Sequence, residues 1–338
     1  MLAMTWSRAT RRTYGAGLLD FHVFCDLQIP PVPESQRAPV SMGLLLEFLS
    51  SCAGMYSGST AKNYIYGVRA WHTTHAIPWR VNEIQLSAAL TAIEKMTPPS
   101  SRRPKRPPVT VDYIEKLAPF FNLASPFDAA VFAALTTTFW SLARLGEFTV
   151  NPDKGPFSPD THVTRSGVSS ESCVGRLGLP VTTFFLPTTK TAPVHGERVQ
   201  WSRQQGPSDP QAALDAHLAV NDPGPNDHLF AWRSKGHLKP LERSVFLRRV
   251  NQAAKKAGLS RMQGHSLRIG GVLEFLLRGI PFDVVKALGR WASDAFTLYL
   301  RESAAILAPY IQDTPILATF SSRSSVSRCR RAYVRRRF

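Results

Sequence analysis

Acidic residues are scarce in this chain of 338 amino acids. It has 24 aspartates and glutamates against 41 lysines and arginines, which leaves a formal net charge of +17 at neutral pH. The isoelectric point is near 10.2. A protein so short of acidic side chains attracts polyanions, so we expect a negatively charged polymer as its partner.

Long apolar runs, targeting signals and metal-ligand patterns are absent as well. No stretch of about 18 uninterrupted apolar residues occurs, so no membrane span is expected. The opening MLAMTWSRATRRTY lacks the apolar core of a signal peptide, which predicts an intracellular protein. Phosphate-loop, dinucleotide and zinc-finger fingerprints are missing, so we expect no cofactor and no metal. The cysteines lack CxxC or metal-ligand spacing and are expected to stay reduced and structural: Cys25, Cys52, Cys173 and Cys329.

A basic, proline-rich segment divides the chain. Residues 97–109, TPPSSRRPKRPPV, contain five prolines and four cations but no acid. Such a segment is extended and semi-rigid and can lie along a phosphate backbone, so we predict a linker there. Before it, residues 1–96 are predicted to form a small helical domain. Helices are expected within residues 6–27, where Tyr14 to Phe24 form an apolar stripe, and at 41–54, 59–76 and 82–96.

Residues 110–315 are predicted to form a second domain, in which helices are interrupted by a small antiparallel sheet. Residues 153–180, rich in Ser, Gly and Pro, indicate a long loop or an irregular strand insertion. Helices are expected near 111–122, 126–145, 208–220 and 241–257, strands near 182–189 and 197–202, and three or four short helices from 264 to about 312.

A basic tail, residues 316–338, follows the second domain. Residues 321–338 contain seven arginines and no acid. Such a tail is disordered in isolation, and it either binds nucleic acid non-specifically or serves as a nuclear import signal.

The most informative residues lie in QGHSLRIGGVLEFLLRGIPFDVVKALGRWASDAFTLY, residues 263–299. His265 and Arg268 are three apart, so on a helix they face one side and can hold one phosphate between them. Tyr299 follows thirty-one residues after Arg268. A tyrosine delivered to that phosphate would be a nucleophile that forms a covalent ester. Taken alone, the same pair would more readily indicate an ordinary surface helix with two polar residues.

Two further segments add donors to this pattern. Arg144 stands three residues before Glu147, at the end of the apolar run DAAVFAALTTTFWSLA. An arginine that closes so apolar a helix needs a carboxylate or a phosphate as partner. LPTTKTAPVHGERVQW predicts two short strands around a tight turn, with Lys190 leaving the first strand and Gly196 opening the second. That lysine is either a solvated charge or, beside two arginines on a phosphate, a proton donor to a leaving oxygen.

Together these residues resemble the motif of the tyrosine recombinase, or phage integrase, family, and they occur in the family's order. The resemblance covers residues 108–312 in detail. It implies an N-terminal helical, SAM-like core-binding domain and an α+β catalytic domain that breaks and rejoins DNA through a 3′-phosphotyrosine, without metal. The implied site residues are Arg144, Glu147 as an orienting carboxylate, Lys190, His265, Arg268, Trp291 or Arg290, and Tyr299 as nucleophile.

The resemblance also implies double-stranded DNA as the partner and a homo-tetramer as the assembly on DNA. The N-terminal cations then either contact the duplex or belong to ordinary solvated helix faces. The candidate DNA-binding residues are Arg8, Arg11, Arg12, Lys62 and Arg69, with Arg102, Arg103, Lys105 and Arg106 in the linker. Within the family, GRWASDAFTLYLRE is most similar to recombinases of Crypton-type mobile elements and their fungal relatives, which implies a nuclear location.

Two positions depart from the family pattern. The family often has a glycine two residues before its first arginine, where this chain has Leu142. Its histidine or tryptophan usually precedes the tyrosine by nine residues, a register that Arg290 holds, while Trp291 has the expected chemistry one residue later. We favour Trp291 and expect Arg290 to contact a backbone phosphate or the surface. Two alternatives stay open: strand relaxation of the type IB topoisomerase kind, and a DNA-binding relative that has lost catalysis.

Overall fold

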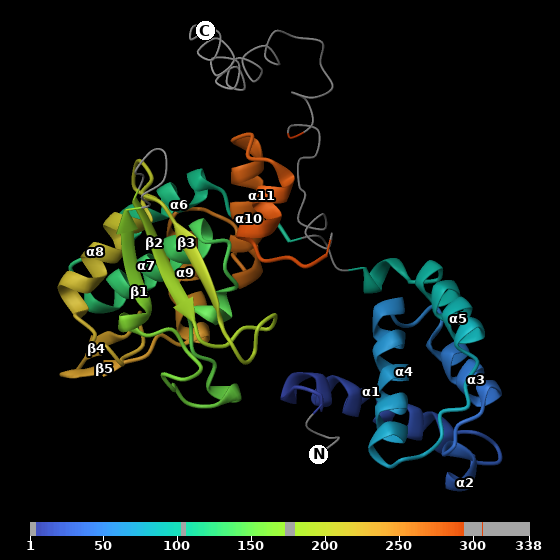
Figure 1. The fold of residues 1–338 in the computed structure, drawn as a ribbon. Coiled ribbons are helices and arrows are strands. Elements are labelled where there is room, and N and C mark those ends of the chain that lie inside the picture. The colour runs from blue at the N-terminus through green and yellow to red at the C-terminus, as the bar shows by residue number, and fades with distance from the viewer. Residues whose placement is uncertain (1–4, 103–105, 173–179, 294–305, 307–338) are drawn as a thin grey trace, which may run out of the picture. The chain divides into compact units, whose positions relative to one another are not determined.

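The computed structural model describes residues 5–102, 106–172, 180–293 and 306 (Figure 1). The chain divides into two compact units, Met1–Lys105 and Arg106–Phe338. Both units are mainly helical, and the strands described in the second unit pair antiparallel in two small sheets, so the predicted fold class is confirmed. Within the described ranges, no helix has both the length and the apolarity needed to cross a membrane.

The first unit is built from short helices that begin at polar capping residues. The side chains of Ser7, Ser41, Ser57 and Asn82 each accept a backbone N–H of the first helical turn, which satisfies donors that the helix itself leaves unpaired. Apolar side chains from α1, α3, α4 and α5 form one buried core. The helices are α1 (Arg8–Asp26), α2 (Glu34–Arg37), α3 (Met42–Cys52), α4 (Gly58–Thr74) and α5 (Glu83–Lys95), followed by the 3₁₀ helix η2 (Pro99–Ser101).

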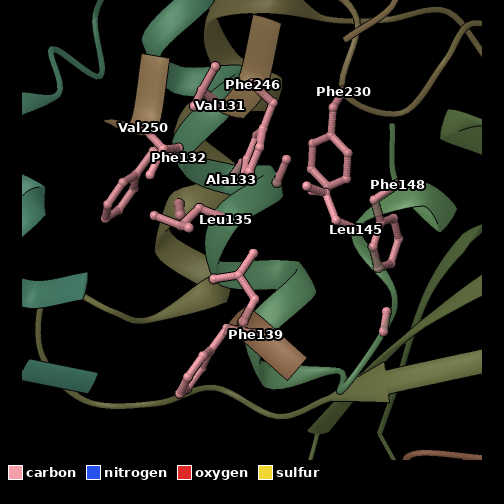
Figure 2. Close-up of a cluster of buried hydrophobic side chains, with 14 of the residues drawn as sticks. Val131, Phe132, Ala133, Leu135, Phe139, Leu145, Phe148, Phe230, Phe246 and Val250 are labelled. Carbon is pink, nitrogen blue, oxygen red and sulfur yellow. The ribbon is translucent and has the colours of Figure 1, made fainter. Parts of the chain in front are cut away.

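The second unit is organised around α7 (Pro126–Trp140), which is buried on all sides from Asp128 onward. Figure 2 shows its apolar side chains, among them Val131 and Leu135, beside Phe246 and Val250 of α9 (Arg243–Lys256). A helix that is apolar all round must lie inside a domain, so the sequence of α7 dictates its central place. The other helices are α6 (Val111–Leu117), α8 (Pro210–Asn221), α10 (Gly264–Leu277) and α11 (Phe282–Leu288).

A three-stranded antiparallel sheet covers part of this core. Its order is β1 (Val168–Ser172), β2 (Pro180–Leu186), β3 (Glu197–Trp201), and Phe184 of β2 pairs with Val199 of β3. Strand β1 lies within the segment where a loop or an irregular strand was expected. A second sheet, the hairpin β4 (Trp232–Ser234) and β5 (His237–Lys239), was not predicted. Its strands have three residues each, which is too short for an alternating pattern to show.

Helix α10 approaches the end of α7 closely because Gly271 has no side chain. A Cβ atom at this position would meet the carbonyl oxygen of Phe139 and the side chain of Leu142. Helices α10 and α11, drawn in orange, pack against each other (Figure 1). This arrangement brings the His265–Arg268 segment to the turn that follows α7 and to the chain that follows α11.

Candidate active site

Arg144 lies just beyond α7 rather than at its end. The helix stops at Trp140, five residues before the predicted boundary, and Arg144 takes an extended conformation before the 3₁₀ turn Leu145–Glu147. One carboxylate oxygen of Glu147 accepts the Arg144 backbone N–H at 2.8 Å, and the other accepts its Nη1 at 2.9 Å. The arginine side chain is 31% exposed and that of the glutamate only 7%. Glu147 therefore fixes both the backbone and the side chain of Arg144.

Leu142 explains why the helix ends early. Its φ of +50° lies in the left-handed region, which favours glycine, the residue that the family often has here. A leucine is held in this strained conformation because its side chain is fully buried in an apolar cluster with Val272, Leu273 and Val285. Packing thus offsets the backbone strain, and the departure from the family pattern leaves the sharp turn before Arg144 intact.

His265 and Arg268 lie on the first turns of α10, as their spacing predicts. The Arg268 side chain is almost fully buried, and its Nη2 donates to the carbonyl oxygen of Gly289. Burial lowers the pKa of His265, and the positive charges of Arg106, Arg268, Arg144 and Arg243 lower it further. His265 is therefore neutral at pH 7 and retains a ring nitrogen that can accept a proton.

Trp291 lies against Arg268. The guanidinium carbon of Arg268 is 4.1 Å from the centroid of the Trp291 ring, which is a cation–π contact. The ring also lies close to the backbone of Gly289, where a Cβ atom would overlap it. A residue with a side chain at this position would displace Trp291, so Gly289 is needed for the stack.

Arg290 is largely buried and ion-paired, so it does not make the surface contact that was one of its two expected roles, and its contact with a backbone phosphate stays a prediction. Its side chain is 10% exposed, and its backbone is left-handed with φ of +59°. Nη2 donates to Glu147 at 2.6 Å and Nη1 to Glu197 at 2.6 Å. The two carboxylates already balance the charge of this guanidinium, and a phosphate that displaced either of them would leave a buried charge without its partner, which is costly.

Lys190 lies exposed in the connection between β2 and β3, four residues after β2 ends at Leu186. Its neighbours Thr189 and Thr191 both donate their hydroxyls to Glu197, at 2.7 and 3.0 Å. Since Glu197 also accepts from Arg290, a continuous set of contacts joins the Lys190 turn to Glu147 and Arg144.

The structure therefore brings together most of the predicted site residues. Arg144, Glu147, His265, Arg268, Arg290 and Trp291 form one neighbourhood, which also includes the turn that carries Lys190. Tyr299 lies outside the described residues. Two residues were missed by sequence reasoning: Glu197, a charge at the start of an ordinary strand, and Arg243, the exposed first residue of α9. No sequence signal marks either, because their partners are distant along the chain.

The candidate DNA-binding cations of the first unit are exposed. Lys62 and Arg69 share one face of α4 with Tyr66, and the Lys62 ammonium lies 5.7 Å from the Tyr66 ring centroid. Arg69 also pairs with Glu83 at 3.0 Å, so part of its charge is already balanced. Arg106 of the linker belongs to the second unit, where its charge lowers the pKa of His265. Arg8, Arg11, Arg12 and Arg102 are exposed, while Arg103 and Lys105 lie outside the described residues, as do Cys173, Cys329 and the basic tail.

Solved structures of tyrosine recombinases share this fold. One is the XerH site-specific recombinase bound to a palindromic difH substrate in a post-cleavage complex, with a TM-score of 0.55 and 16% identity over 89% of this chain and 79% of that chain. Another is a lambda integrase dimer bound to a COC′ core site, with a TM-score of 0.54 and 14% identity over 88% of this chain and 73% of that chain. No protein-family model and no curated protein matches the sequence. The chain has the tyrosine recombinase fold.

Proposed function

We propose that this chain is a site-specific DNA recombinase that cleaves and rejoins DNA through a 3′-phosphotyrosine intermediate. The observation that carries the proposal is the convergence of Arg144, His265 and Arg268, with Trp291 stacked on Arg268, within a tyrosine recombinase fold. These residues are distant along the sequence but lie close together in the second unit, as they must if they bind one phosphate.

The donors suit a phosphate under attack. Nucleophilic attack on phosphorus places additional negative charge on the non-bridging oxygens, and Arg144, Arg268 and the Trp291 indole N–H supply fixed donors for it. Glu147 and Gly289 hold the two arginines in place before DNA binds. Losing one preorganised donor of this kind costs about 2.7–4 kcal/mol of barrier.

Proton transfer completes the step. The Tyr299 oxygen forms a bond to phosphorus while the bond from phosphorus to the 5′-oxygen breaks. His265, neutral because burial and neighbouring cations lower its pKa, accepts the phenolic proton. Lys190 donates a proton to the leaving 5′-oxygen. Rejoining runs these transfers in reverse, so the bond energy is retained in the phosphotyrosine and no nucleotide cofactor is required.

Trp291, rather than Arg290, is proposed as the donor that precedes the nucleophile. The Arg290 guanidinium is already engaged by Glu147 and Glu197, whereas Trp291 lies beside Arg268. Arg290 thus holds the spacing from Tyr299 that the family prefers but serves as an ion-pair partner, whereas Trp291, one residue later, supplies the donor to the phosphate.

The remaining parts of the chain are proposed to bind DNA and to direct the protein to it. Residues 1–96 form the core-binding domain, residues 97–109 the linker and residues 110–315 the catalytic domain, while the basic tail 316–338 adds non-specific affinity or directs the protein to the nucleus. Four copies assemble on two DNA sites. The element that encodes such a chain would be a mobile one of the Crypton or fungal kind, and its terminal repeats in flanking DNA would supply the target.

Covalent capture tests the function without a known target. The protein is incubated with a pool of random-sequence duplexes that carry a nick in one strand, so that a short cleaved fragment is lost and the adduct accumulates. We expect adduct that survives denaturant and is released by protease digestion. Exchange of strands between two captured duplexes separates recombination from topoisomerase-like relaxation. DNA binding without any adduct would instead identify a relative that has lost catalysis.

A further inference from the structure

A series of buried charged contacts connects the turn of Arg144 with the turn of Lys190. Glu147 holds Arg144 at 2.9 Å and accepts from Arg290 at 2.6 Å, and Arg290 donates in turn to Glu197 at 2.6 Å. The three middle members come from distant parts of the chain: the turn after α7, the start of β3 and the segment after α11. Glu147 holds Arg144 itself, Glu197 accepts from the threonines on either side of Lys190, and Arg290 joins the two carboxylates.

The middle of the series is shielded from water and balanced in charge. The side chains of Glu147, Arg290 and Glu197 are 7, 10 and 21% exposed. Burial by itself would raise the pKa of Glu197, but the hydroxyls of Thr189 and Thr191 and the charge of Arg290 lower it overall, so the carboxylate is ionised at pH 7. Two arginines face two glutamates, and removing one member leaves an uncompensated charge.

The turn that carries Lys190 is fastened on both sides of the lysine. Thr189 is buried and its hydroxyl both donates to Glu197 and accepts the backbone N–H of Ala192 at 3.0 Å. The backbone N–H of Thr189 donates to the carbonyl oxygen of Ala192 at 3.2 Å, which closes the turn. Thr191 also donates to Glu197. Lys190 is therefore an exposed residue at the centre of a turn in which the residues on both sides are bound to one carboxylate.

We infer that Glu197 and Arg290 are positioning residues that hold Lys190 in place as the proton donor to the leaving 5′-oxygen. A general acid must lie within hydrogen-bond reach of the oxygen, about 2.6–3.2 Å, when the bond breaks. The connection between β2 and β3 places Lys190 reproducibly only if its turn is fixed, and Arg290 ties that turn to the carboxylate that orients Arg144. The position of Lys190 relative to Arg144 is thereby kept fixed. This inference rests on the proposed function.

The experiment compares two substrates that differ at the leaving atom. Both are nicked duplexes of a sequence recovered by covalent capture, one with the natural 5′-oxygen at the cleaved bond and one with sulfur in its place. A thiolate leaves without protonation near neutral pH, because a thiol has a pKa of about 8.5, far below that of an alcohol. A defect confined to proton donation therefore disappears on the sulfur substrate.

Four variants are measured in single-turnover cleavage. Lys190→Ala removes the acid, and Glu197→Ala removes the acceptor of both hydroxyls and a partner of Arg290. Glu197→Gln keeps the size and an acceptor oxygen but removes the charge. Asp215→Ala is the matched control, since its carboxylate accepts from Gln211 on α8 instead.

We expect Lys190→Ala and Glu197→Ala to lose about 10²-fold or more in cleavage of the oxygen substrate, the lower end of the range for a general acid, and to approach the wild-type rate on sulfur. Glu197→Gln should show a smaller loss with the same rescue, and Asp215→Ala none. Wild-type cleavage of the oxygen substrate by Glu197→Ala would overturn the inference. So would an equal loss on both substrates, because that pattern marks damage to the phosphate cage or the fold. Absence of adduct from the wild-type protein on either substrate would instead contradict the proposed function itself.

Discussion

Separate substitutions of Trp291 and Arg290 test which of the two residues donates a hydrogen bond to the phosphate. Trp291→Phe keeps an aromatic ring that can stack on Arg268, but this ring is smaller than the indole and carries no N–H. Arg290→Gln keeps most of the side-chain length and deletes the charge that pairs with Glu147 and Glu197. The two substitutions therefore perturb neighbouring positions in different ways, one removing a donor and the other removing a buried counter-charge.

The structure gives the expected sizes of the two effects. Removing one partner from a buried ion pair destabilises a protein by about 3–5 kcal/mol. Glu147 still has Arg144, and Glu197 still has two hydroxyl donors, so Arg290→Gln should fall near the lower end of that range. Trp291→Phe keeps a ring against Arg268 but loses part of the indole, so it should destabilise the protein less than Arg290→Gln does. The loss of one preorganised donor in Trp291→Phe should slow cleavage by about 10²–10³-fold.

Three assays distinguish these outcomes: thermal unfolding, duplex affinity, and the single-turnover rate of adduct formation. We expect Trp291→Phe to lose cleavage with unchanged affinity and only a small decrease in melting temperature. Arg290→Gln should lower the melting temperature, with a smaller loss of cleavage measured below it. A Trp291→Phe variant that cleaves normally, together with a stable Arg290→Gln variant that does not cleave, would refute this reasoning and assign the phosphate to Arg290.

Three further predictions concern the strained turn, the buried histidines and the division between cleavage and binding. Because Leu142 is left-handed, Leu142→Gly should be more stable than Leu142→Ala by about 1 kcal/mol in thermal unfolding, the reverse of the usual order, although both lose the buried side chain. Burial lowers the pKa of His217 to about 4, whereas the histidine of the unfolded chain titrates near 6.5. The unfolded state therefore binds more protons between these pH values, and the free energy of unfolding should fall by up to about 3 kcal/mol as the pH drops from 6.5 to 4. His217→Gln should flatten that dependence. A variant with an unchanged pH profile would contradict this account. Arg144→Ala and Arg268→Ala should lower the cleavage rate far more than duplex affinity, while deletion of residues 321–338 should weaken binding uniformly and reduce its salt dependence; a deletion that leaves the salt slope unchanged would exclude the tail as a polycation.

Local spacing explains which parts of this molecule could be predicted. The apolar run of α7 predicts a central helix, and the three-residue spacing of His265 and Arg268 places both on one face of α10. Both are properties of a few consecutive residues. The hairpin of β4 and β5 was not predicted because its strands are too short to show an alternating pattern.

The end of α7 shows where a local pattern fails. Nothing in TTTFWSLA marks a stop, because the residues after Trp140 are as suited to a helix as those before it. The stop depends on tertiary packing, since Gly271 allows α10 to approach and the buried Leu142 accepts a left-handed backbone. Sequence periodicity carries no information about either contact.

The position of Arg290 could not be predicted for a related reason. Its partners, Glu147 and Glu197, are 143 and 93 residues away along the chain, and neither belongs to a local motif that includes it. From the sequence, Arg290 is a candidate for the site by its spacing from Tyr299, but nothing there indicates the two carboxylates that pair with it. Only the folded arrangement shows that its charge is balanced inside the site, while Trp291 beside it stacks on Arg268.

The central claim is that Tyr299 attacks a DNA phosphate, and one substitution tests it directly. Tyr299→Phe deletes only the phenolic oxygen, so folding and duplex binding should be preserved. We predict that the wild-type protein forms a covalent adduct on a nicked duplex and that the Phe variant, bound to the same duplex with the same affinity, forms none. An adduct formed by the Phe variant at the wild-type rate would show that another residue is the nucleophile.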